Sequence, residues 1–261
     1  MPPTPSPEAL VLTGAVLFLA GLLQGASGFG YGIAAMSLLP YFIHPKIAVV
    51  YVGVLAPLVS GHLLLSLRRH VSWRRILLVY GAYLAIGLPL GLWIFGAADA
   101  RILKQIVGAS LAAGCAALWL ATGSKTYALP RWLGLPTGAL SGLLSGVAGV
   151  GGPPVVVYMW LQDITKEEAS GTLQAYFTLG NLTKLAGFCA LAAVHWKGYE
   201  LVTLKNCLTA LVFWPGLAIG CWLGLRLFHK IDAEKIRRTA YALVIVAGVV
   251  MFLKAALAAH P

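Results

Sequence analysis

Two glycine clusters carry the residue types and spacing in this chain that could bind a ligand. The first reads GLLQGASGFGYG at residues 21–32, and the second reads GLLSGVAGVGGPP at residues 142–154. With Gly21 placed on Gly142, six of the first ten positions agree. Glycine permits positive φ angles and close backbone approach, and proline fits the first turn of a new helix. Each cluster therefore predicts a break between two helices.

A helix that begins at such a break directs unbonded backbone amides and the positive end of its dipole into the space before it. This arrangement favours a bound anion. The second cluster would shape the main site and the first a pseudo-symmetric one. The predicted binding residues of the clusters are Gly146, Gly149, Gly151, Gly152 and Pro153, then Gln24, Gly25, Ser27, Gly28 and Gly30. The alternative is that the glycines only let membrane helices pack closely.

Three polar residues in later apolar segments are further candidate contacts for the same ligand. Asn181 and Lys184 lie one helical turn apart, and His62 lies in the matching segment of the first half. By contrast, all 8 acidic residues fall at segment ends or in loops, as we expect for a carrier of anions. Snorkelling and hydrogen bonds between helices are the alternative roles for the three side chains.

The sequence predicts neither a metal site nor a cofactor. The 4 cysteines are scattered singly, without a CxxC pair or a Cys/His ligand spacing. The glycines are not surrounded by the strand and helix pattern of a nucleotide-binding fold. The segment at 25–28 fits the GxSG pattern of intramembrane serine proteases, with His62 as a nominal base, but Ala148 stands in place of this serine in the second copy. We therefore expect a protein that is not an enzyme.

The elements that position these residues must be membrane helices. Hydrophobic residues make up 59% of the chain, charged residues make up 10%, and the mean hydropathy is +0.85, well beyond the values of a soluble domain. We expect an all-α polytopic membrane protein that forms one integral membrane domain over residues 1–261. Two repeats, 9–122 and 133–258, would be joined by a linker at 123–132. Each would open with a glycine-interrupted helical hairpin and continue with three transmembrane helices.

The distribution of Lys and Arg bears on this arrangement, because cytoplasmic loops carry an excess of positive charge. If each long apolar stretch folds back as a hairpin, 12 Lys and Arg lie on one side of the membrane and 6 on the other. An odd number of crossings then separates equivalent points, so the halves are inverted, which is a common plan of secondary transporters. We assign the net charge of +11 to membrane headgroups rather than to nucleic acid.

At the two clusters the sequence resembles the TauE/SafE family of membrane transporters, also called the sulfite exporter or TSUP family. The likeness covers about residues 8–258, and KEEASGTLQA at 166–175 is similar to a stretch that follows the second cluster in the family. The resemblance implies transport of sulfite, sulfonates or other sulfur-containing anions across the bacterial cytoplasmic membrane. The first cluster departs from the glycine-proline pattern, because Gly32 stands where the second has Pro153.

These observations predict a multi-pass secondary transporter of the bacterial cytoplasmic (inner) membrane. Its expected substrate is a small anion, sulfite or another sulfur oxyanion or organosulfonate, moved by alternating access. An anion channel and a membrane thiol-electron carrier are the alternatives. The expected partners are the anion and the lipid bilayer, without nucleic acid. The sequence leaves open a coupling ion, either a proton or sodium, and a homodimer.

Overall fold

The computed structural model describes residues 6–121, 127, 129–227 and 233–257, and the regular elements in this part of the chain are helices. The first half contains α1 (Pro7–Ser27), α2 (Tyr31–Phe42), α3 (Pro45–Leu67), the short η1 (Arg68–His70), α4 (Trp73–Ala82), the π-helical η2 (Tyr83–Gly87), α5 (Leu88–Ala97) and α6 (Ala100–Ala121). The second half contains η3 (Arg131–Leu133), α7 (Gly134–Ala148), α8 (Gly152–Trp160), α9 (Lys166–Ala193), α10 (Leu204–Val212), α11 (Trp214–Leu227) and α12 (Ala233–Leu257).

Several of these helices have the length and composition of membrane spans. Among the described residues five qualify, namely Pro7–Ser27, Pro45–His70, Trp73–Ala97, Ala100–Ala121 and Arg238–Leu257. Helices α10 and α11 together form a sixth candidate, with a bend of 41° between them. At 28 residues, α9 is also longer than the ~30 Å hydrocarbon core requires, although it carries buried polar residues such as Gln174 and Lys184. The prediction of an all-α polytopic membrane protein is confirmed.

Each glycine cluster interrupts a helix, as predicted. Helix α1 ends at Gly28 with φ 77°, and α2 begins after Gly30 with φ 107°. Helix α7 is capped by Gly149 with φ 70°, and α8 begins three residues later, at Gly152. These left-handed conformations favour glycine. With 12 and 9 residues, α2 and α8 are too short to cross a bilayer alone, so each hairpin has a short returning arm.

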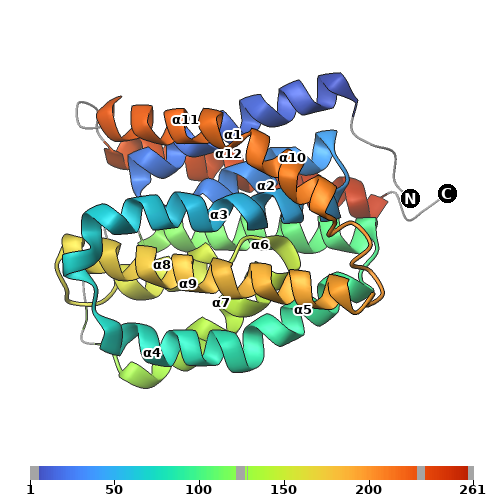
Figure 1. The fold of residues 1–261 in the computed structure, drawn as a ribbon. Helices are drawn as coiled ribbons and strands as arrows, with labels where there is room; N and C mark the ends of the chain where they lie inside the picture. The colour runs from blue at the N-terminus through green and yellow to red at the C-terminus, as the bar shows by residue number, and fades with distance from the viewer. Residues whose placement is uncertain (1–5, 122–126, 128, 228–232, 258–261) are drawn as a thin grey trace.

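The first helix of each half packs against the other half of the chain. Gly25 of α1 lies against Cys221 of α11, and Gly14 lies near Phe213, so these two helices run parallel. In the same way α7 runs parallel to the continuous α4, η2 and α5, because Gly134 lies against Val79 and Gly146 against Gly91 (Figure 1). Each hairpin is therefore held by helices from the other half of the chain.

Two other helix pairs join the halves in the antiparallel sense. Gly53 of α3 lies near Phe188 of α9, whereas Gly61 lies near Thr178, so the residue numbers run in opposite directions. Helices α6 and α12 also run antiparallel, because Gly108 lies against Phe252 and the Arg101 Nε donates to the Ala255 carbonyl at 2.9 Å. Antiparallel pairing of matching helices is the geometry that inverted repeats would produce.

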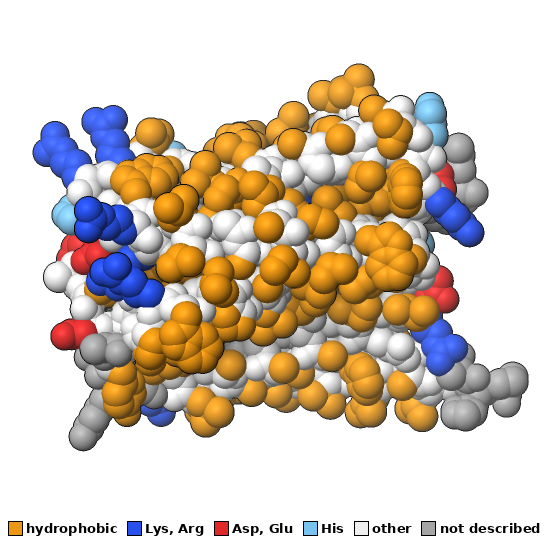
Figure 2. Space-filling model, turned by 90° about the horizontal axis from the view of Figure 1, so that it is seen from below, with side chains coloured by type: hydrophobic (Ala, Val, Ile, Leu, Met, Phe, Trp, Pro, Cys, Tyr) orange, Lys and Arg blue, Asp and Glu red, His pale blue; other side chains and the backbone are white. Residues whose placement is uncertain are grey.

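The two ends of the bundle differ from its middle. Figure 1 shows the turns from α3 to α4 and from α8 to α9 at one end, and the start of α1 and the end of α12 at the other. On the face drawn in Figure 2, Lys and Arg gather at the two ends and hydrophobic side chains cover the band between them. The bilayer must surround this band, with the helix axes running across it.

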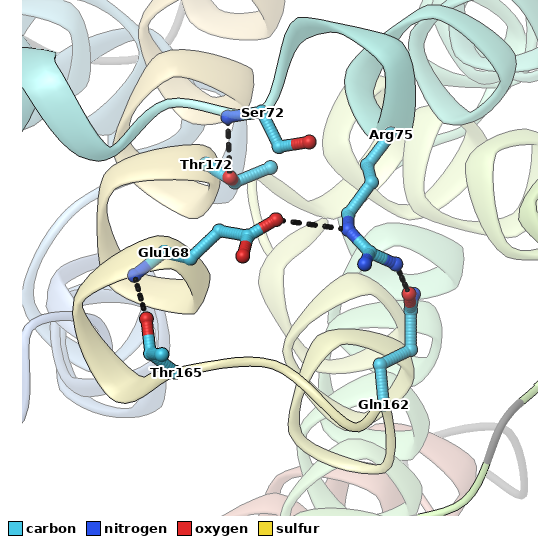
Figure 3. A network of polar contacts seen from close by, with 6 residues as sticks. All are labelled: Ser72, Arg75, Gln162, Thr165, Glu168 and Thr172. Carbon is cyan, nitrogen blue, oxygen red and sulfur yellow. Dashed lines mark hydrogen bonds and ion pairs between the residues drawn. The ribbon is translucent and has the colours of Figure 1, made fainter.

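A polar network ties three elements together at the end of the bundle that holds these turns (Figure 3). The Arg75 Nε of α4 lies 3.1 Å from the Glu168 Oε1 of α9, and the same guanidinium donates to the Gln162 Oε1, just after α8. Thr165 caps α9 by accepting from the Glu168 amide at 3.1 Å, and the Ser72 amide donates to Thr172 at 3.0 Å. The network fixes the start of α9 against α4.

We expect Arg75→Ala and Glu168→Ala to be coupled in a double-mutant cycle by about 1 kcal/mol of unfolding free energy. The value is modest because about a third of each side chain is exposed to solvent, which screens the pair. The measurement is reversible unfolding of wild type, both single variants and the double variant in mixed micelles. Strictly additive losses would show that the ion pair contributes nothing.

Candidate functional site

A cavity of about 80 Å³ lies where the two hairpin breaks face α3 and α9. Its α3 residues fall within 52–60 and its α9 residues within 176–181, which are near the middle of both helices. Six of the residues predicted from the sequence line it, namely Gln24, Gly30, Gly149, Gly151, Gly152 and Asn181. The other seven, Gly25, Ser27, Gly28, His62, Gly146, Pro153 and Lys184, do not contribute to its wall.

The start of α2 is partly capped by the protein itself. The Gln24 side chain, on α1, accepts from the Tyr31 amide at 2.9 Å and donates to the Gly28 carbonyl at 3.3 Å. Buried Gln174 of α9 donates to the same carbonyl. Gln24 and Gln174 therefore bond to the backbone of the first break. One amide at the start of α2 is thus already satisfied by the protein.

The start of α8 offers few amides because of its prolines. Pro153 and Pro154 lack an N–H, so within the first turn only Gly152 can donate, next to Gly151 in the preceding position. Pro153 instead packs on α6, where a Cβ on Gly114 would come within 2.8 Å of its ring. The breaks thus supply fewer backbone donors than the glycine-rich sequence suggests.

Side-chain hydroxyls supply much of the polar wall, and the sequence analysis did not select them. The Tyr83 hydroxyl, on η2, donates to the Gly180 carbonyl at 2.7 Å and lies 3.4 Å from the Ser145 Oγ. The Tyr176 hydroxyl donates to the Ser141 Oγ at 2.9 Å, and Ser141 donates on to the Gly151 carbonyl. These contacts join η2, α7 and α9 around the second break.

Three residues on the wall have donor capacity that the described part of the protein does not use. The Tyr31 hydroxyl is buried without a hydrogen-bond partner among the described residues. The Ser145 hydroxyl has only the long 3.4 Å contact with the Tyr83 oxygen, and the Asn181 amide donates to no other described residue. Since Asp and Glu are absent from the wall, the cavity holds donors without a negative charge to satisfy them.

The repeat could have revealed part of this wall. In the alignment that places Gly21 on Gly142, Gln24 falls on Ser145 and Ser60 falls on Asn181. All four residues line the cavity. A polar residue at the same position of both copies therefore indicates a residue of the cavity wall. The tyrosines of the wall are not paired in this way, so the sequence does not indicate them.

Lys184 is buried next to the cavity without a compensating charge. It is 1% exposed, and its Cε would lie 3.6 Å from a Cβ on Gly53 of α3. It forms no hydrogen bond or ion pair with another described residue, and it follows the lining residue Gly180 by one helical turn. A buried cation of this kind favours the approach of an anion.

The remaining predicted residues have other surroundings. A Cβ on Gly25 would lie 2.0 Å from the Cys221 carbonyl oxygen, and a Cβ on Gly146 would lie 2.8 Å from Gly91, so both sit at helix crossings. The Ser27 hydroxyl donates to the Leu23 carbonyl at 2.7 Å. His62 is exposed on α3. These residues do not line the cavity.

A polytopic helical protein with two broken helices, and with a cavity that carries hydroxyl and amide groups at the middle of its long helices, has the architecture of a membrane transporter. A family model described as "Sulfite exporter TauE/SafE" matches residues 13–251, so the chain belongs to this family and is a multi-pass transporter of the bacterial inner membrane. It is similar to a Cupriavidus necator protein named "Probable sulfite/organosulfonate exporter TauE", with 27% identity over 254 residues, or 92% of this chain and 93% of that protein. No solved structure matches the chain.

Proposed function

We propose that the protein is a secondary carrier of a small anion, with sulfite or an organosulfonate as the substrate. The observation that carries the proposal is the cavity wall, which has unused donors on Tyr31, Ser145 and Asn181 and has neither Asp nor Glu. The name of the Cupriavidus necator relative supports the choice of a sulfur anion. The role is one of transport and not of catalysis.

The wall suits an oxyanion because its hydroxyls can turn. The Tyr83 proton is given to the Gly180 carbonyl, so the Ser145 hydroxyl, 3.4 Å from the Tyr83 oxygen, can turn its own proton toward a ligand, and the Asn181 amide can donate twice. Hydrogen bonds to a charged acceptor are about twice as strong as neutral ones, and they replace the water that the anion gives up. Lys184 lies one helical turn beyond the lining residue Gly180, and its positive charge would balance the charge of the bound anion.

Alternating access is the proposed mechanism. The antiparallel pairs of α3 with α9 and of α6 with α12, and the parallel pairs of each hairpin with the opposite half, support two inverted repeats. Because α3 and α9 both flank the cavity, a tilt of one repeat against the other would open it to each side in turn. An ion gradient, of protons or sodium, or the anion gradient itself would supply the energy.

Two alternatives of the sequence analysis are less well supported. A thiol-electron carrier needs paired thiols, and none of Cys115, Cys189, Cys207 and Cys221 lies on the cavity wall. An anion channel would require a continuous pore, and its unitary currents in a planar bilayer would separate it from a carrier.

Proteoliposomes test the proposal directly. Sulfite, sulfate, thiosulfate, sulfoacetate, taurine and chloride are compared for flux that saturates with concentration and counterflows against a second anion. We expect saturable flux of at least one sulfur anion, and its absence for the whole panel would contradict the proposal.

We expect Tyr31→Phe to lower this flux about tenfold without a loss of stability, since it removes a buried hydroxyl that has no partner in the described part of the chain. Tyr199→Phe is the matched control, because the Tyr199 hydroxyl lies away from the cavity and donates to the Leu92 carbonyl at 2.7 Å. It should lose about 1 kcal/mol of unfolding free energy and keep its flux. If Tyr31→Phe keeps its flux and Tyr199→Phe loses it, Tyr31 does not contribute to the site.

A further inference from the structure

A second pocket lies at the opposite end of the bundle from the Arg75 network. It has a volume of about 330 Å³ and lies between the end of α2, the start of α6 and the end of α12. Its walls include Pro40, Tyr41 and Met251, which are apolar or amphipathic. Its charged members are three cations, Arg101, Lys104 and Lys254.

These cations are not neutralised by the described part of the protein. Arg101 donates to the Ala255 carbonyl at 2.9 Å, and neither Lys104 nor Lys254 forms a hydrogen bond or ion pair with a described residue. The nearest acidic residue along the chain, Asp99, accepts from the Ile102 amide at 2.7 Å, where it caps α6, and does not line the pocket. The pocket therefore concentrates positive charge.

The position of the pocket determines which molecules can bind there. Arg101 and Lys104 lie in the first turns of α6 and Lys254 in the last turn of α12, so the cations lie at the level of the membrane surface. The half-exposed Tyr41 lies beside them, as aromatic residues do at membrane interfaces. Met251 precedes Lys254 by about one turn of α12, so this apolar part of the wall lies deeper than the cations.

We propose that this pocket binds an anionic phospholipid, with the headgroup phosphate between Lys104, Lys254 and Arg101 and an acyl chain along the apolar wall. A free anion would use only the cations and would leave Pro40, Tyr41 and Met251 without a role. A lipid uses both parts, because its phosphate can accept charge-assisted hydrogen bonds from the cations while an acyl chain covers the apolar wall. The lipid would join α2, the returning arm of the first hairpin, to the α6 and α12 pair.

The test uses the full chain in detergent micelles and compares Lys104→Gln/Lys254→Gln with Lys197→Gln/Lys205→Gln. Both double variants remove two positive charges, but Lys197 and Lys205 lie outside the pocket. Arg101 is retained because of its bond to α12. The probes are phosphatidylglycerol, phosphatidylcholine with the same acyl chains, and inorganic phosphate.

We expect phosphatidylglycerol to raise the melting temperature of the wild type and of the Lys197/Lys205 variant by about 5 °C more than phosphatidylcholine does. The Lys104/Lys254 variant should bind phosphatidylglycerol about 30-fold more weakly and lose most of this shift. An undiminished shift in that variant would overturn the proposal. A shift of the same size with inorganic phosphate alone would also overturn it, because the site would then serve a soluble anion.

Discussion

Gly25→Ala is expected to leave almost no correctly folded protein. A Cβ at this position would lie 2.0 Å from the Cys221 carbonyl oxygen and 2.9 Å from both the Cys221 carbonyl carbon and the Leu225 amide nitrogen. All three are backbone atoms of α11, which cannot turn aside as a side-chain end would. The two helices would have to separate, and their contact also involves Gly21, Gly220 and Gly224. We expect a loss of more than about 3 kcal/mol of unfolding free energy.

Two other helical glycines provide matched controls for this substitution. A Cβ on Gly216 of α11, or on Gly81 of α4, would meet no atom within 4 Å. Gly216→Ala and Gly81→Ala should therefore be neutral or stabilising by up to about 1 kcal/mol, because alanine is the better helix former. The readout is the yield of monodisperse protein after extraction and its melting temperature. A Gly25→Ala protein that folds normally but has lost flux would assign this glycine to the ligand instead.

Lys184→Met is expected to have the opposite signature, a large loss of function with no loss of stability. Methionine has a similar length, and it removes a charge that is buried without a partner among the described residues. Removing such a charge should be neutral or should stabilise the fold by about 1 to 3 kcal/mol. If the lysine balances the bound anion, flux should fall at least about 100-fold, which corresponds to about 2.7 kcal/mol of lost interaction.

The experiment pairs proteoliposome flux with thermal unfolding for each variant. Lys205→Met, at the start of exposed α10, removes one positive charge away from the cavity and should keep both flux and stability. A Lys184→Met protein with normal flux would exclude a role for this residue in transport. A Lys184→Met protein that unfolds would show that Lys184 has a structural role, with a partner that forms in another conformation of the carrier.

The features that the sequence predicted correctly are local. Glycines in the middle of long apolar runs break the helix at Gly28 and Gly149 because the backbone there adopts a left-handed conformation, and this requirement is visible in the residue type. Hydropathy and loop charge likewise depend on consecutive residues, so the membrane fold could be predicted from them. Pro153 could be placed at the start of α8, but its packing on Gly114 could not.

The cavity wall depended on contacts between distant parts of the chain. Tyr83 reaches Gly180, and Tyr176 reaches Ser141, across separations of 97 and 35 residues. In a single sequence a tyrosine within an apolar helix looks like any packing residue, because nothing local marks the partner of its hydroxyl. For the same reason the sequence could not show that the glycines have different surroundings. Gly151 lies on the cavity wall, whereas Gly25 lies at a helix crossing.

The packing of α1 on α11 has a consequence for the order in which the chain is made. Gly21 of α1 rests on Leu217, so the ribosome must add almost 200 residues before the partner of the first helix exists. At 5–20 residues per second this takes about 10 to 40 s. By contrast α7 emerges after α4 and α5, which already await it in the membrane. The N-terminal helix is therefore the first to be inserted and among the last to be assembled, and a chain that stops before α11 leaves it without its site of packing.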